Sequence, residues 1–401
     1  MSGFGGTEMF PHCNIYISSA EWNFGQRPFK YTMPSGFKPL ATPFHPDPAI
    51  ADPTNHFQPI GYTGDGSATR TVTGWKFDPD LLWIKERPTD GWQHTLYDKI
   101  RGAGTNSVKK SLNTDSNNSE ASGNDTTHGY LSSFESGGYG LTKGSQGGGD
   151  YMNHSGWTYI AWGWKAATTA SGTWGANSKA YSRRIDSTAG ISLIKFTGDA
   201  STGIPGTGAI PHGLSGAPDL IIQKRIDATG NWWAGFNILD ASWDYMKVDD
   251  DTAKGDEGYA LWDADEISNW GAPDNSEFMT YVFKSIPGFS RFGKYSGNNS
   301  NDGQLIQCGF APAYVMIKRT DSTGNWAIND TVRDGNNMDY GNDASIYANT
   351  ADSEKTSSSL NLDFLSNGFK LRSNNASYNG TGTYIYLAFA SKPFKYARAV
   401  N

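Results

Sequence analysis

An eight-residue segment occurs twice in the chain and constrains the fold more than any other feature. Residues 225–232 read Arg-Ile-Asp-Ala-Thr-Gly-Asn-Trp, and residues 319–326 repeat this segment with six of the eight positions identical. Each copy follows a short apolar run that begins with Pro and ends with Lys. Such runs occur at residues 79–85, 218–224 and 312–318. The later two runs lie roughly a hundred residues apart, the size of a small sandwich domain rather than of a solenoid unit, so the sequence predicts domain-sized repeats.

The apolar runs predict buried strands. In the first run, Leu81, Trp83 and the stem of Lys85 point to one side of a strand while Leu82 and Ile84 point to the other, which implies cover on both faces. No segment shows helical periodicity of useful length, and Gly, Trp and Tyr are abundant at 48, 14 and 20 residues. The predicted fold is therefore all-β, with tandem antiparallel β-sandwich domains of the jelly-roll or lectin-like type.

The repeats divide the chain into five segments. The prolines of residues 39–59 fix φ and remove backbone donors, so residues 1–59 are predicted to be an N-terminal adaptor segment with a Pro-rich linker. The three β-sandwich repeats are predicted at residues 60–167 (repeat 1), 190–286 (repeat 2) and 287–401 (repeat 3), and a Ser-, Ala- and Gly-rich connector at residues 168–189. Each repeat is long enough to bury a core of its own.

The closing strand of repeat 1 has one bulky face. Ile160, Trp162 and Trp164 alternate with smaller or less apolar neighbours. This alternation predicts a strand packed face to face against another sheet.

The charge of the chain limits its partners. The formal net charge is −7 at pH 7, and the sequence shows no concentrated basic face of the kind that nucleic acid binding requires. It also shows no uninterrupted apolar run of membrane-spanning length, so neither nucleic acid binding nor membrane insertion is expected. Cys13 and Cys308 lie far apart in the sequence, which indicates two unpaired packed thiols rather than a disulfide framework.

Four motifs recur across residues 60–396. They are a Tyr-x-Gly-x-Gly opening, a strand of the form Gly-Phe-x-Pro-x-x-Val-x-Ile-Lys-Arg, an Asp-x-x-Arg-Gly turn at residues 98–102 and a closing Tyr-Ile-Ala-Trp-x-Trp-Lys strand. Together they resemble a lectin-like sandwich repeat in structural proteins of marine bacteriophages, cyanophages especially. Repeat 2 departs from the pattern, because it has no clear counterpart of the Asp-x-x-Arg-Gly turn or of the Asn-Gly-Phe strand at residues 367–369. The resemblance implies a fibre or appendage subunit of a virion, without naming the ligand.

The N-terminal segment carries a second resemblance. Residues 23–29, Asn-Phe-Gly-Gln-Arg-Pro-Phe, are followed by a Pro-Ser-Gly-Phe turn at residues 34–37. This pair looks like the C-terminal end of the SPRY-like, concanavalin-type sandwich of phage fibre proteins, and the earlier strands of such a domain are missing. Residues 1–38 are too short for an independent core, so we expect them to attach to repeat 1 or to another subunit.

Two sets of residues recur with the repeats and are the candidate ligand-binding residues. In the first set, a lysine ends each apolar run, either as a binding residue or as a strand-end lysine with a buried stem. In the second set, a tryptophan follows each run, either as a sugar-stacking platform or as a cap on the open end of the sandwich. The adjacent pair Trp232 and Trp233 favours the sugar interpretation slightly, because alternation leaves one of the two free of the core. The candidates are Lys85, Lys224, Lys318, Trp92, Trp232 and Trp326.

No catalytic, metal-ligating or cofactor-binding residue is predicted. Acidic clusters at residues 249–257 and 263–266 offer oxygen ligands for Ca²⁺, but they match no EF-hand loop and are interpreted as solvated loop charge. A glycosidase needs two carboxylates on rigid strands, whereas the carboxylates of this chain lie mostly in Gly-, Ser- and Asn-rich segments. The seven histidines show no metal-ligand spacing, and no nucleophile elbow or phosphate-binding loop occurs.

These observations predict a non-enzymatic virion protein, a tail or head fibre subunit that attaches to a host surface glycan. The expected partners are two further copies in a homotrimer, an inference from the fibre resemblance, and other virion proteins bound through the N-terminal segment. A virion-borne polysaccharide depolymerase, a capsid decoration protein and a free carbohydrate-binding module remain alternatives. A carboxylate pair facing one cleft would favour the enzyme.

Overall fold

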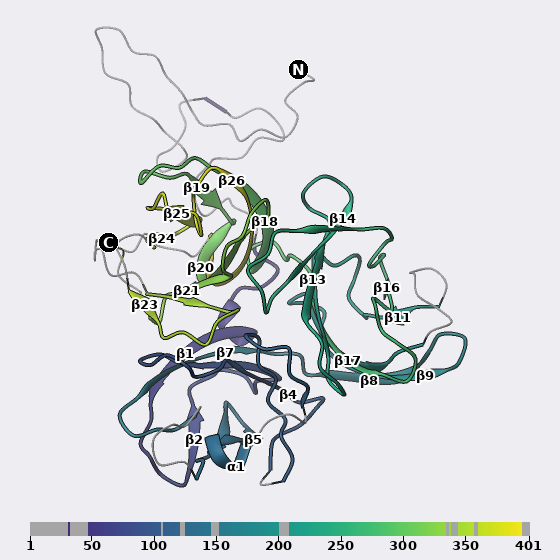
Figure 1. Cartoon of the computed structure of the whole chain (residues 1–401). Helices are drawn as coiled ribbons and strands as arrows, with labels where there is room; N and C mark the ends of the chain where they lie inside the picture. The colour runs from purple at the N-terminus through teal and green to yellow at the C-terminus, as the bar shows by residue number, and fades with distance from the viewer. Residues whose placement is uncertain are drawn as a thin grey trace, which may run out of the picture. The chain divides into compact units, whose positions relative to one another are not determined.

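The computed structural model describes residues 31–32, 47–105, 107–120, 125–145, 152–199, 208–333, 337, 344–356 and 360–394. The chain divides into two compact units, residues 1–47 and residues 48–401, and only the second is described in any length (Figure 1). The predicted SPRY-like segment therefore lies outside the described residues, apart from Tyr31 and Thr32. The described elements are strands joined by turns, with only the 3-10 helix η2 (Pro53–Asn55) and the single-turn helix α1 (Asp125–His128) besides. The predicted all-β fold is confirmed.

Repeat 1 is a sandwich of two antiparallel sheets. The four-stranded inner sheet has the order β1-β7-β3-β4 and the three-stranded outer sheet the order β2-β6-β5. The inner strands are β1 (Phe57–Thr63), β7 (Thr158–Trp164), β3 (Leu81–Glu86) and β4 (Thr95–Asp98), and the outer strands are β2 (Thr69–Thr73), β6 (Gly138–Thr142) and β5 (Tyr130–Glu135). In β3, Leu81 and Trp83 join one buried cluster while Leu82 and Ile84 join another, so the predicted cover on both faces is confirmed.

The bulky face predicted for β7 is present. Ile160, Trp162 and Trp164 all belong to one buried cluster. On the opposite face, a Cβ at Gly163 would stand 2.4 Å from Nε1 of Trp75. Glycine at this position lets the Trp75 ring lie flat against the strand, where Nε1 donates to Gln58 O over 3.0 Å.

Repeat 2 has the largest sheet and the smallest cover. Its inner sheet has eight strands in the order β15-β14-β13-β12-β17-β10-β9-β8, and its outer layer contains the two-stranded sheet β11-β16. The inner strands are β15 (Gly255–Glu257), β14 (Trp243–Lys247), β13 (Trp232–Phe236), β12 (Leu220–Arg225), β17 (Glu277–Phe283), β10 (Ile191–Thr197), β9 (Lys179–Asp186) and β8 (Thr168–Trp174), and the outer strands are β11 (Ile210–Pro211) and β16 (Glu266–Ile267).

The predicted connector at residues 168–189 is wrong, because β8 and β9 fall within it and extend the sheet of repeat 2. Strand β9 pairs with β10 over residues 181–186 and with β8 along its other edge. The small residues that indicated a linker, such as Ser171 and Gly172, lie on an edge strand that is largely exposed. Such a strand needs no apolar alternation, and the sequence signal was therefore absent.

Repeat 3 returns to the plan of repeat 1. Its inner sheet has the order β18-β26-β20-β21-β22-β23 and its outer sheet the order β19-β25-β24. The inner strands are β18 (Ser290–Gly297), β26 (Gly382–Pro393), β20 (Phe310–Arg319), β21 (Ala327–Asp330), β22 (Ala344–Tyr347) and β23 (Lys355–Thr356), and the outer strands are β19 (Leu305–Gln307), β25 (Gly368–Leu371) and β24 (Leu362–Leu365). Strand β25 contains the Asn-Gly-Phe signal of the sequence.

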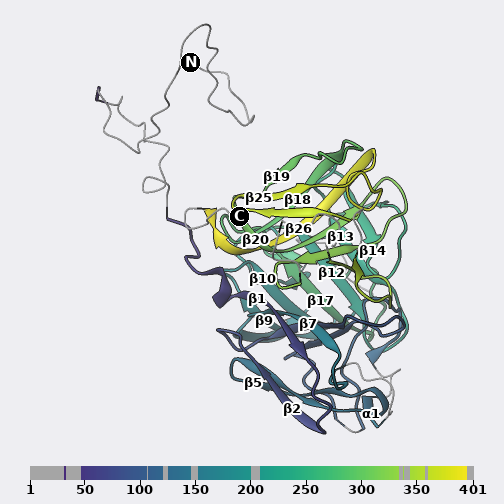
Figure 2. The same cartoon turned by 90° about the vertical axis from the view of Figure 1, so that its left-hand side faces the viewer.

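The inner sheets of the three repeats share one core. The buried aromatic residues on the faces that these sheets turn toward the centre belong to a single cluster. It includes Trp83, Trp162, Trp232, Tyr281, Tyr314 and Phe389. Strands β20 and β26 of repeat 3 lie beside β1 of repeat 1 (Figure 2), where Phe57 stacks on Phe389 with ring centroids 4.8 Å apart. The prediction of a separate core for each repeat therefore holds only for the faces toward the outer layers. The faces toward the centre are buried only by packing against the inner sheets of the other repeats.

The repeats also interlock through equivalent backbone hydrogen bonds of 2.9 Å, and these bonds close a cycle. They run from Gly230 N of repeat 2 to Asn117 O of repeat 1, from Gly324 N of repeat 3 to Asp251 O of repeat 2, and from Gly91 N of repeat 1 to Ala351 O of repeat 3. Every repeat thus donates to one neighbour and accepts from the other.

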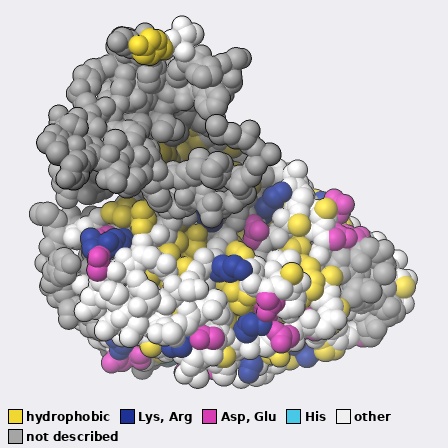
Figure 3. Space-filling view, turned by 90° about the horizontal axis from the view of Figure 1, so that it is seen from above, with side chains coloured by type: hydrophobic (Ala, Val, Ile, Leu, Met, Phe, Trp, Pro, Cys, Tyr) yellow, Lys and Arg dark blue, Asp and Glu magenta, His cyan; other side chains and the backbone are white. Residues whose placement is uncertain are grey.

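The described surface carries both signs of charge. Figure 3 shows Lys, Arg, Asp and Glu side chains interspersed over the described part of one face, without a broad region of one sign. This distribution agrees with the net charge of −7. Among the described residues, no helix is long and apolar enough to cross a membrane.

Candidate functional site

The three predicted lysines lie inside the molecule. Nζ of Lys224 donates to Asn117 O over 3.0 Å and to Gly230 O over 2.5 Å, and Nζ of Lys318 donates to Asp251 O and Thr252 O over 2.9 Å each. All three side chains, that of Lys85 included, are fully buried. Burial lowers the pKa of Lys224 and of Lys318 to about 8. Lys224 and Lys318 hold a neighbouring repeat, whereas Nζ of Lys85 lies 3.9 Å from Oε2 of Glu86 in its own repeat. The prediction that these lysines bind a ligand is wrong.

Two of the predicted tryptophans are also core residues. Trp232 is 0% exposed and Trp326 is 2% exposed, so neither ring presents a face to a sugar. Nε1 of Trp232 donates to Asn113 O over 2.7 Å, and Nε1 of Trp326 donates to Lys247 O over 2.8 Å. The sugar-stacking interpretation is therefore wrong for both residues. Alternation along β13 turns Trp232 inward and Trp233 outward, so the free ring of the pair is that of Trp233.

The third member of the set is His94 rather than Trp92. In repeat 2, Trp232 pairs with Lys224, and in repeat 1 the register that pairs Ile84 with Thr95 places His94 beside Lys85. The half-buried Trp92 packs against Trp157 instead, with ring centroids 6.0 Å apart. Two residues separate Gly91 from His94 in repeat 1, whereas one residue separates the equivalent glycine from the tryptophan in repeats 2 and 3. The sequence pattern therefore pointed to Trp92 instead of His94.

The hydrogen bonds of His94 fix its tautomer. Nε1 of Trp83 donates to Nδ1 of His94 over 2.8 Å, so Nδ1 carries no proton. Nε2 then donates to Tyr347 O over 3.0 Å, as the indoles of Trp232 and Trp326 donate to the other two repeats. Burial lowers the pKa of His94 well below its ordinary value, and the ring stays neutral.

An aromatic groove in repeat 2 is the candidate functional site. This groove, called the Trp233 groove below, has a volume of about 490 Å³. Its aromatic wall consists of Trp233, Tyr245, Tyr259 and Trp270. Trp233 meets Tyr245 edge to face at 5.3 Å and Trp270 at 6.1 Å between ring centroids. The Tyr259 ring is 37% exposed, so the groove opens to solvent.

The groove lies where the outer layer of repeat 2, in the part of it that the structure describes, is reduced. Repeats 1 and 3 each cover their inner sheet with a three-stranded outer sheet, whereas repeat 2 has the two-stranded sheet β11-β16 and its loops. Strand β16 stands where repeat 3 has the Asn-Gly-Phe strand, since it pairs with β11 on one side and with Trp262 on the other, and the third outer strand is reduced to that single bridge. Trp233 on β13 and Tyr245 on β14 therefore remain half-buried rather than covered.

Polar groups of the groove are held by neighbouring donors and acceptors. Nε1 of Trp270 donates to Oε2 of Glu257 over 2.9 Å, and Gly258 N donates to Oε1 over the same distance. Nε2 of Gln223 donates to Trp270 O over 2.5 Å. These bonds fix the rings in place before any ligand arrives, which lowers the entropic cost of binding.

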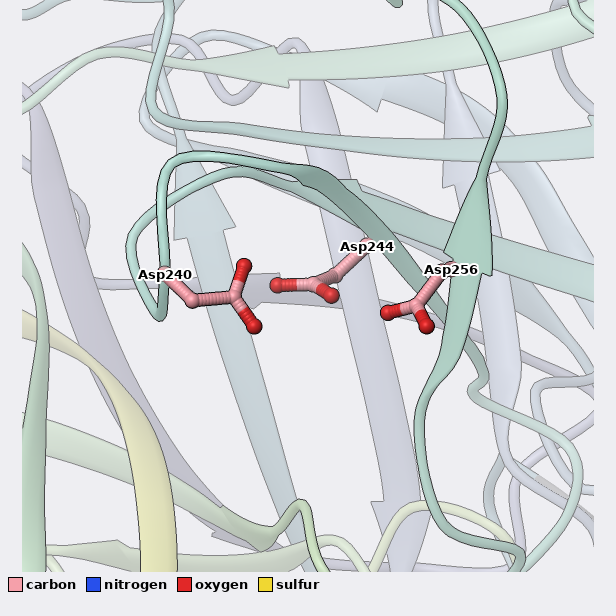
Figure 4. Close-up of side chains that lie close together, drawn as sticks. All are labelled: Asp240, Asp244 and Asp256. Atoms are coloured by element: carbon pink, nitrogen blue, oxygen red, sulfur yellow. The ribbon is translucent and has the colours of Figure 1, made fainter.

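Three aspartates gather at the margin of the groove. Carboxylate oxygens of Asp240, Asp244 and Asp256 lie within 4.8 Å of one another, and Figure 4 shows the three groups pointing toward a common centre. Nζ of Lys254 lies between them, 2.6 Å from Oδ1 of Asp244, 2.5 Å from Oδ1 of Asp256 and 3.5 Å from Oδ2 of Asp240. This ammonium supplies the positive charge that a metal ion would bring. The other predicted acidic residues cap backbone amides, as Asp249 does for Trp232 N over 3.0 Å.

Asp256 is not placed to act as a general acid in the groove. Asp256 lines it, but the hydrogen bond from Lys254 lowers the pKa of this carboxyl, so it cannot keep a proton to donate near neutral pH. Burial raises the pKa of Asp244, the buried neighbour of Asp256, but Asp244 is not a lining residue of the groove. A wall of aromatic rings with fixed polar groups is the usual chemistry of a saccharide-binding surface.

The sequence analysis identified Trp233 only as the partner of a repeated tryptophan. Tyr245, Tyr259 and Trp270 have no equivalents in the repeated motifs, so a search for recurring residues passed over them. The signal that could have found them is the departure of repeat 2 from the repeated motifs, since a reduced outer layer leaves part of an inner sheet uncovered.

One family model matches most of the chain. It covers residues 52–393 and is described as a domain of unknown function, DUF7483. No curated protein and no solved structure matches the chain.

Proposed function

We propose that this chain, which belongs to the DUF7483 family, binds a glycan in the Trp233 groove and serves as an attachment subunit of a virion. The observation that carries the proposal is the uncovered aromatic wall of repeat 2. The rings of Trp233, Tyr245 and Tyr259 are partly exposed in a protein whose other large aromatic residues are mostly core. Exposed apolar rings that are fixed by hydrogen bonds mark a binding surface.

The polar groups of the groove favour a sugar over an apolar ligand. Gln223, Asn231 and Glu257 line it beside the rings and offer both donors and acceptors. Pyranose rings present apolar C–H faces and polar rims, which match such a mixed wall. The volume of about 490 Å³ lies within the range of small-molecule pockets, so one or two sugar rings are the size of ligand that fits.

The virion role rests on the resemblance of the sequence motifs to phage fibre proteins, and the groove is compatible with it. A fibre gains affinity by presenting several weak sites at once, by about 10²–10⁴ when geometry allows. A homotrimer would offer three Trp233 grooves, with residues 1–38 attaching the subunit to other virion proteins. Deleting residues 1–50 should then leave a folded protein that no longer joins the particle, as measured by its incorporation into purified virions.

The test of glycan binding compares two tryptophans. Trp233→Ala removes a groove ring, and we expect binding to glycans of the host surface to weaken on the order of tenfold or more in titration calorimetry. Trp92→Ala is the matched control, because Trp92 is also half-buried and lies in repeat 1. Unchanged binding by Trp233→Ala, or an equal loss in both variants, would contradict the assignment of the groove.

A depolymerase is the second candidate, favoured only by the carboxylates of Asp256 and Glu257 in the groove. Incubation of the protein with the glycan it binds, followed by reducing-end measurement, separates the two functions. We expect no release of shorter chains. Release that Asp256→Asn abolishes would establish the enzyme instead.

A further inference from the structure

A second pocket, of about 610 Å³, lies between repeat 1 and strand β9 of repeat 2. We propose that it binds an anionic group, namely the phosphate, sulfate or carboxylate of a small molecule or of an acidic sugar. The proposal is independent of glycan binding in the Trp233 groove. The charged residues that line the pocket are Lys76, Lys99, Lys165, Arg184, Asp78 and Asp80.

Asp80 fixes the floor of the pocket. It is fully buried, and its Oδ2 accepts a hydrogen bond of 2.6 Å from Ala166 N. Its backbone joins two further segments, since Asp80 N donates to Trp164 O over 2.8 Å and Lys99 N donates to Asp80 O over 2.9 Å. The segments that carry the cations are thus held by regular backbone bonds rather than by mobile loops, so the pocket is formed before a ligand arrives.

The cations around Asp80 exceed what its carboxylate can neutralise. Oδ1 of Asp80 accepts from Arg184 over 2.6 Å and also lies 3.4 Å from Nζ of Lys99. Nζ of Lys165 makes no hydrogen bond and no ion pair with any residue that the structure describes. Lys76 is paired with Asp52 over 2.9 Å, outside the lining of the pocket. The lining thus holds four cationic side chains and two carboxylates, in a chain whose net charge is −7.

Asp78 offsets part of this charge, since Lys99 and Lys165 are among the lesser causes that lower the pKa of its carboxyl. Its Oδ1 accepts from Gly137 N over 2.9 Å and from the hydroxyl of Ser136 over 3.0 Å, which directs the carboxylate toward the outer sheet. The hydrogen bond from Gly137 N is the main reason why the pKa of Asp78 is lowered. His56, the remaining titratable group of the lining, is engaged by Asp186, with 2.5 Å between Nδ1 and Oδ2.

Repeat 2 shows what the fold alone requires at this position. Asp219 is the equivalent of Asp80, because its N donates to Phe283 O over 2.9 Å and its Oδ2 accepts from Ser285 N over 2.6 Å. Among the described residues, no Lys or Arg pairs with Asp219. Lys284, the equivalent of Lys165, donates to Ser215 O instead. The aspartate caps a strand end in both repeats, and the cation cluster is an addition of repeat 1 that strand capping does not need.

The number and spread of the cations indicate the ligand class. Ammonium groups from two separate segments suit the several oxygens of a phosphate, sulfate or carboxylate group. The volume exceeds that of one small ion and lies within the range of small-molecule pockets. An anionic group on a larger molecule is therefore the ligand that fits.

The experiment titrates the full-length protein with inorganic phosphate and, separately, with glucuronate, at an ionic strength held constant with sodium chloride. We expect both anions to bind, and Lys99→Ala and Lys165→Ala each to weaken binding about tenfold, the typical effect of one charge-assisted hydrogen bond. Lys284→Ala is the matched control and should bind as the unchanged protein does. Lys165→Gln provides a second variant of similar size if Lys165→Ala lowers the melting temperature.

The two anions distinguish the sources of the group. Tighter binding of phosphate would assign a phosphorylated ligand, and tighter binding of glucuronate would assign an acidic sugar. The proposal is overturned if neither anion binds at constant ionic strength, or if the Lys99 and Lys165 variants bind as tightly as the Lys284 variant.

Discussion

Three aromatic residues at equivalent positions each donate one hydrogen bond to a neighbouring repeat. Trp232 reaches Asn113 O, Trp326 reaches Lys247 O and His94 reaches Tyr347 O. A planar N–H donor is common to all three, whereas ring size is not. The position therefore selects for a donor at the end of a flat, apolar side chain, a requirement that explains the substitution of histidine for tryptophan.

The first prediction concerns the stability that these rings provide. Trp326→Ala removes a buried ring and leaves Lys247 O without its donor, so we expect the free energy of unfolding to fall by about 3–5 kcal/mol. Denaturant unfolding followed by intrinsic fluorescence measures the change. The half-buried Trp92 serves as the comparison, and Trp92→Ala should cost clearly less. A loss below about 1 kcal/mol for Trp326→Ala would show that the ring contributes little.

The second prediction concerns the pH dependence of stability. Burial raises the pKa of Asp115 to about 7 from its ordinary value of 3.8. The folded protein thus keeps a proton that the unfolded chain releases, so the stabilising contribution is complete below about pH 4 and is lost as the pH rises through about 7. The slope reaches about 1.4 kcal/mol per pH unit between these values.

The variant for this test replaces Asp115 with the residue that repeat 3 has at the equivalent position. The register of the sheets places Asn349 where repeat 1 has Asp115. Asp115→Asn cannot titrate, so we expect its stability to fall less than that of the unchanged protein between pH 5 and pH 8. Parallel denaturant curves at the two pH values give the comparison. Equal slopes for the two proteins would mean that Asp115 does not keep its proton in the fold.

Recurrence in the sequence identified the repeated lysines and the tryptophans of repeats 2 and 3 correctly as a set, but the ligand-binding role predicted for them was wrong. Lys224, Lys318, Trp232 and Trp326 recur because the same clamp between repeats occurs more than once, and a recurring contact within the fold gives the same signal as a recurring ligand site. Burial separates the two cases, and burial depends on the neighbouring repeat, which lies about a hundred residues away in the sequence.

At the scale of the elements, the difference between the repeats lies in the outer layer. The outer sheets of repeats 1 and 3 have three strands, and that of repeat 2 has two. The sequence of repeat 2 showed this difference as the absence of an Asn-Gly-Phe motif, where the short strand β16 stands. Its consequence, an uncovered part of the inner sheet, appears only when the sheets are paired. Alternation along β3 and β7 predicted their buried faces correctly, because both strands are covered on both sides.

The third prediction concerns the packing between the two sheets of repeat 1. A Cβ at Gly163 would stand 2.4 Å from Nε1 of Trp75, a rigid ring that cannot turn away because it is 5% exposed. We therefore expect Gly163→Ala to destabilise the protein by about 1–3 kcal/mol, as overpacking in a core does. Thermal unfolding monitored by circular dichroism measures the loss.

The control for this prediction is a glycine with free space. A Cβ at Gly258 meets no atom within 4 Å, and its backbone is not in the left-handed region. Gly258→Ala should therefore change the stability by less than about 0.5 kcal/mol. Equal effects of the two substitutions would show that backbone freedom, rather than contact with Trp75, determines the cost.

At the scale of the whole second unit, the three interfaces between repeats use two kinds of contact. Oδ2 of Asp98 accepts from the Tyr281 hydroxyl over 3.1 Å, and Oδ2 of Asp330 accepts from Nε1 of Trp162 over 3.0 Å. The equivalent position of repeat 2 is Phe236, which packs on Phe292 with ring centroids 6.0 Å apart. The Asp-x-x-Arg turn that the sequence of repeat 2 lacks is thus replaced by an apolar contact, which leaves no buried carboxylate unpaired.

The fourth prediction follows from the core that the three repeats share. Residues 168–286, which include β8 and β9, would when expressed alone expose the inward faces of Trp232 and Tyr281, which other repeats cover in the intact unit. The lost burial amounts to several large side chains at about 1.5–3 kcal/mol each, more than the net stability of a domain this small usually allows. We therefore expect residues 168–286 to show no cooperative unfolding in calorimetry, and residues 48–401 to unfold in a single transition. Separate transitions for the repeats, or a stable isolated fragment, would mean that each outer core is sufficient for folding.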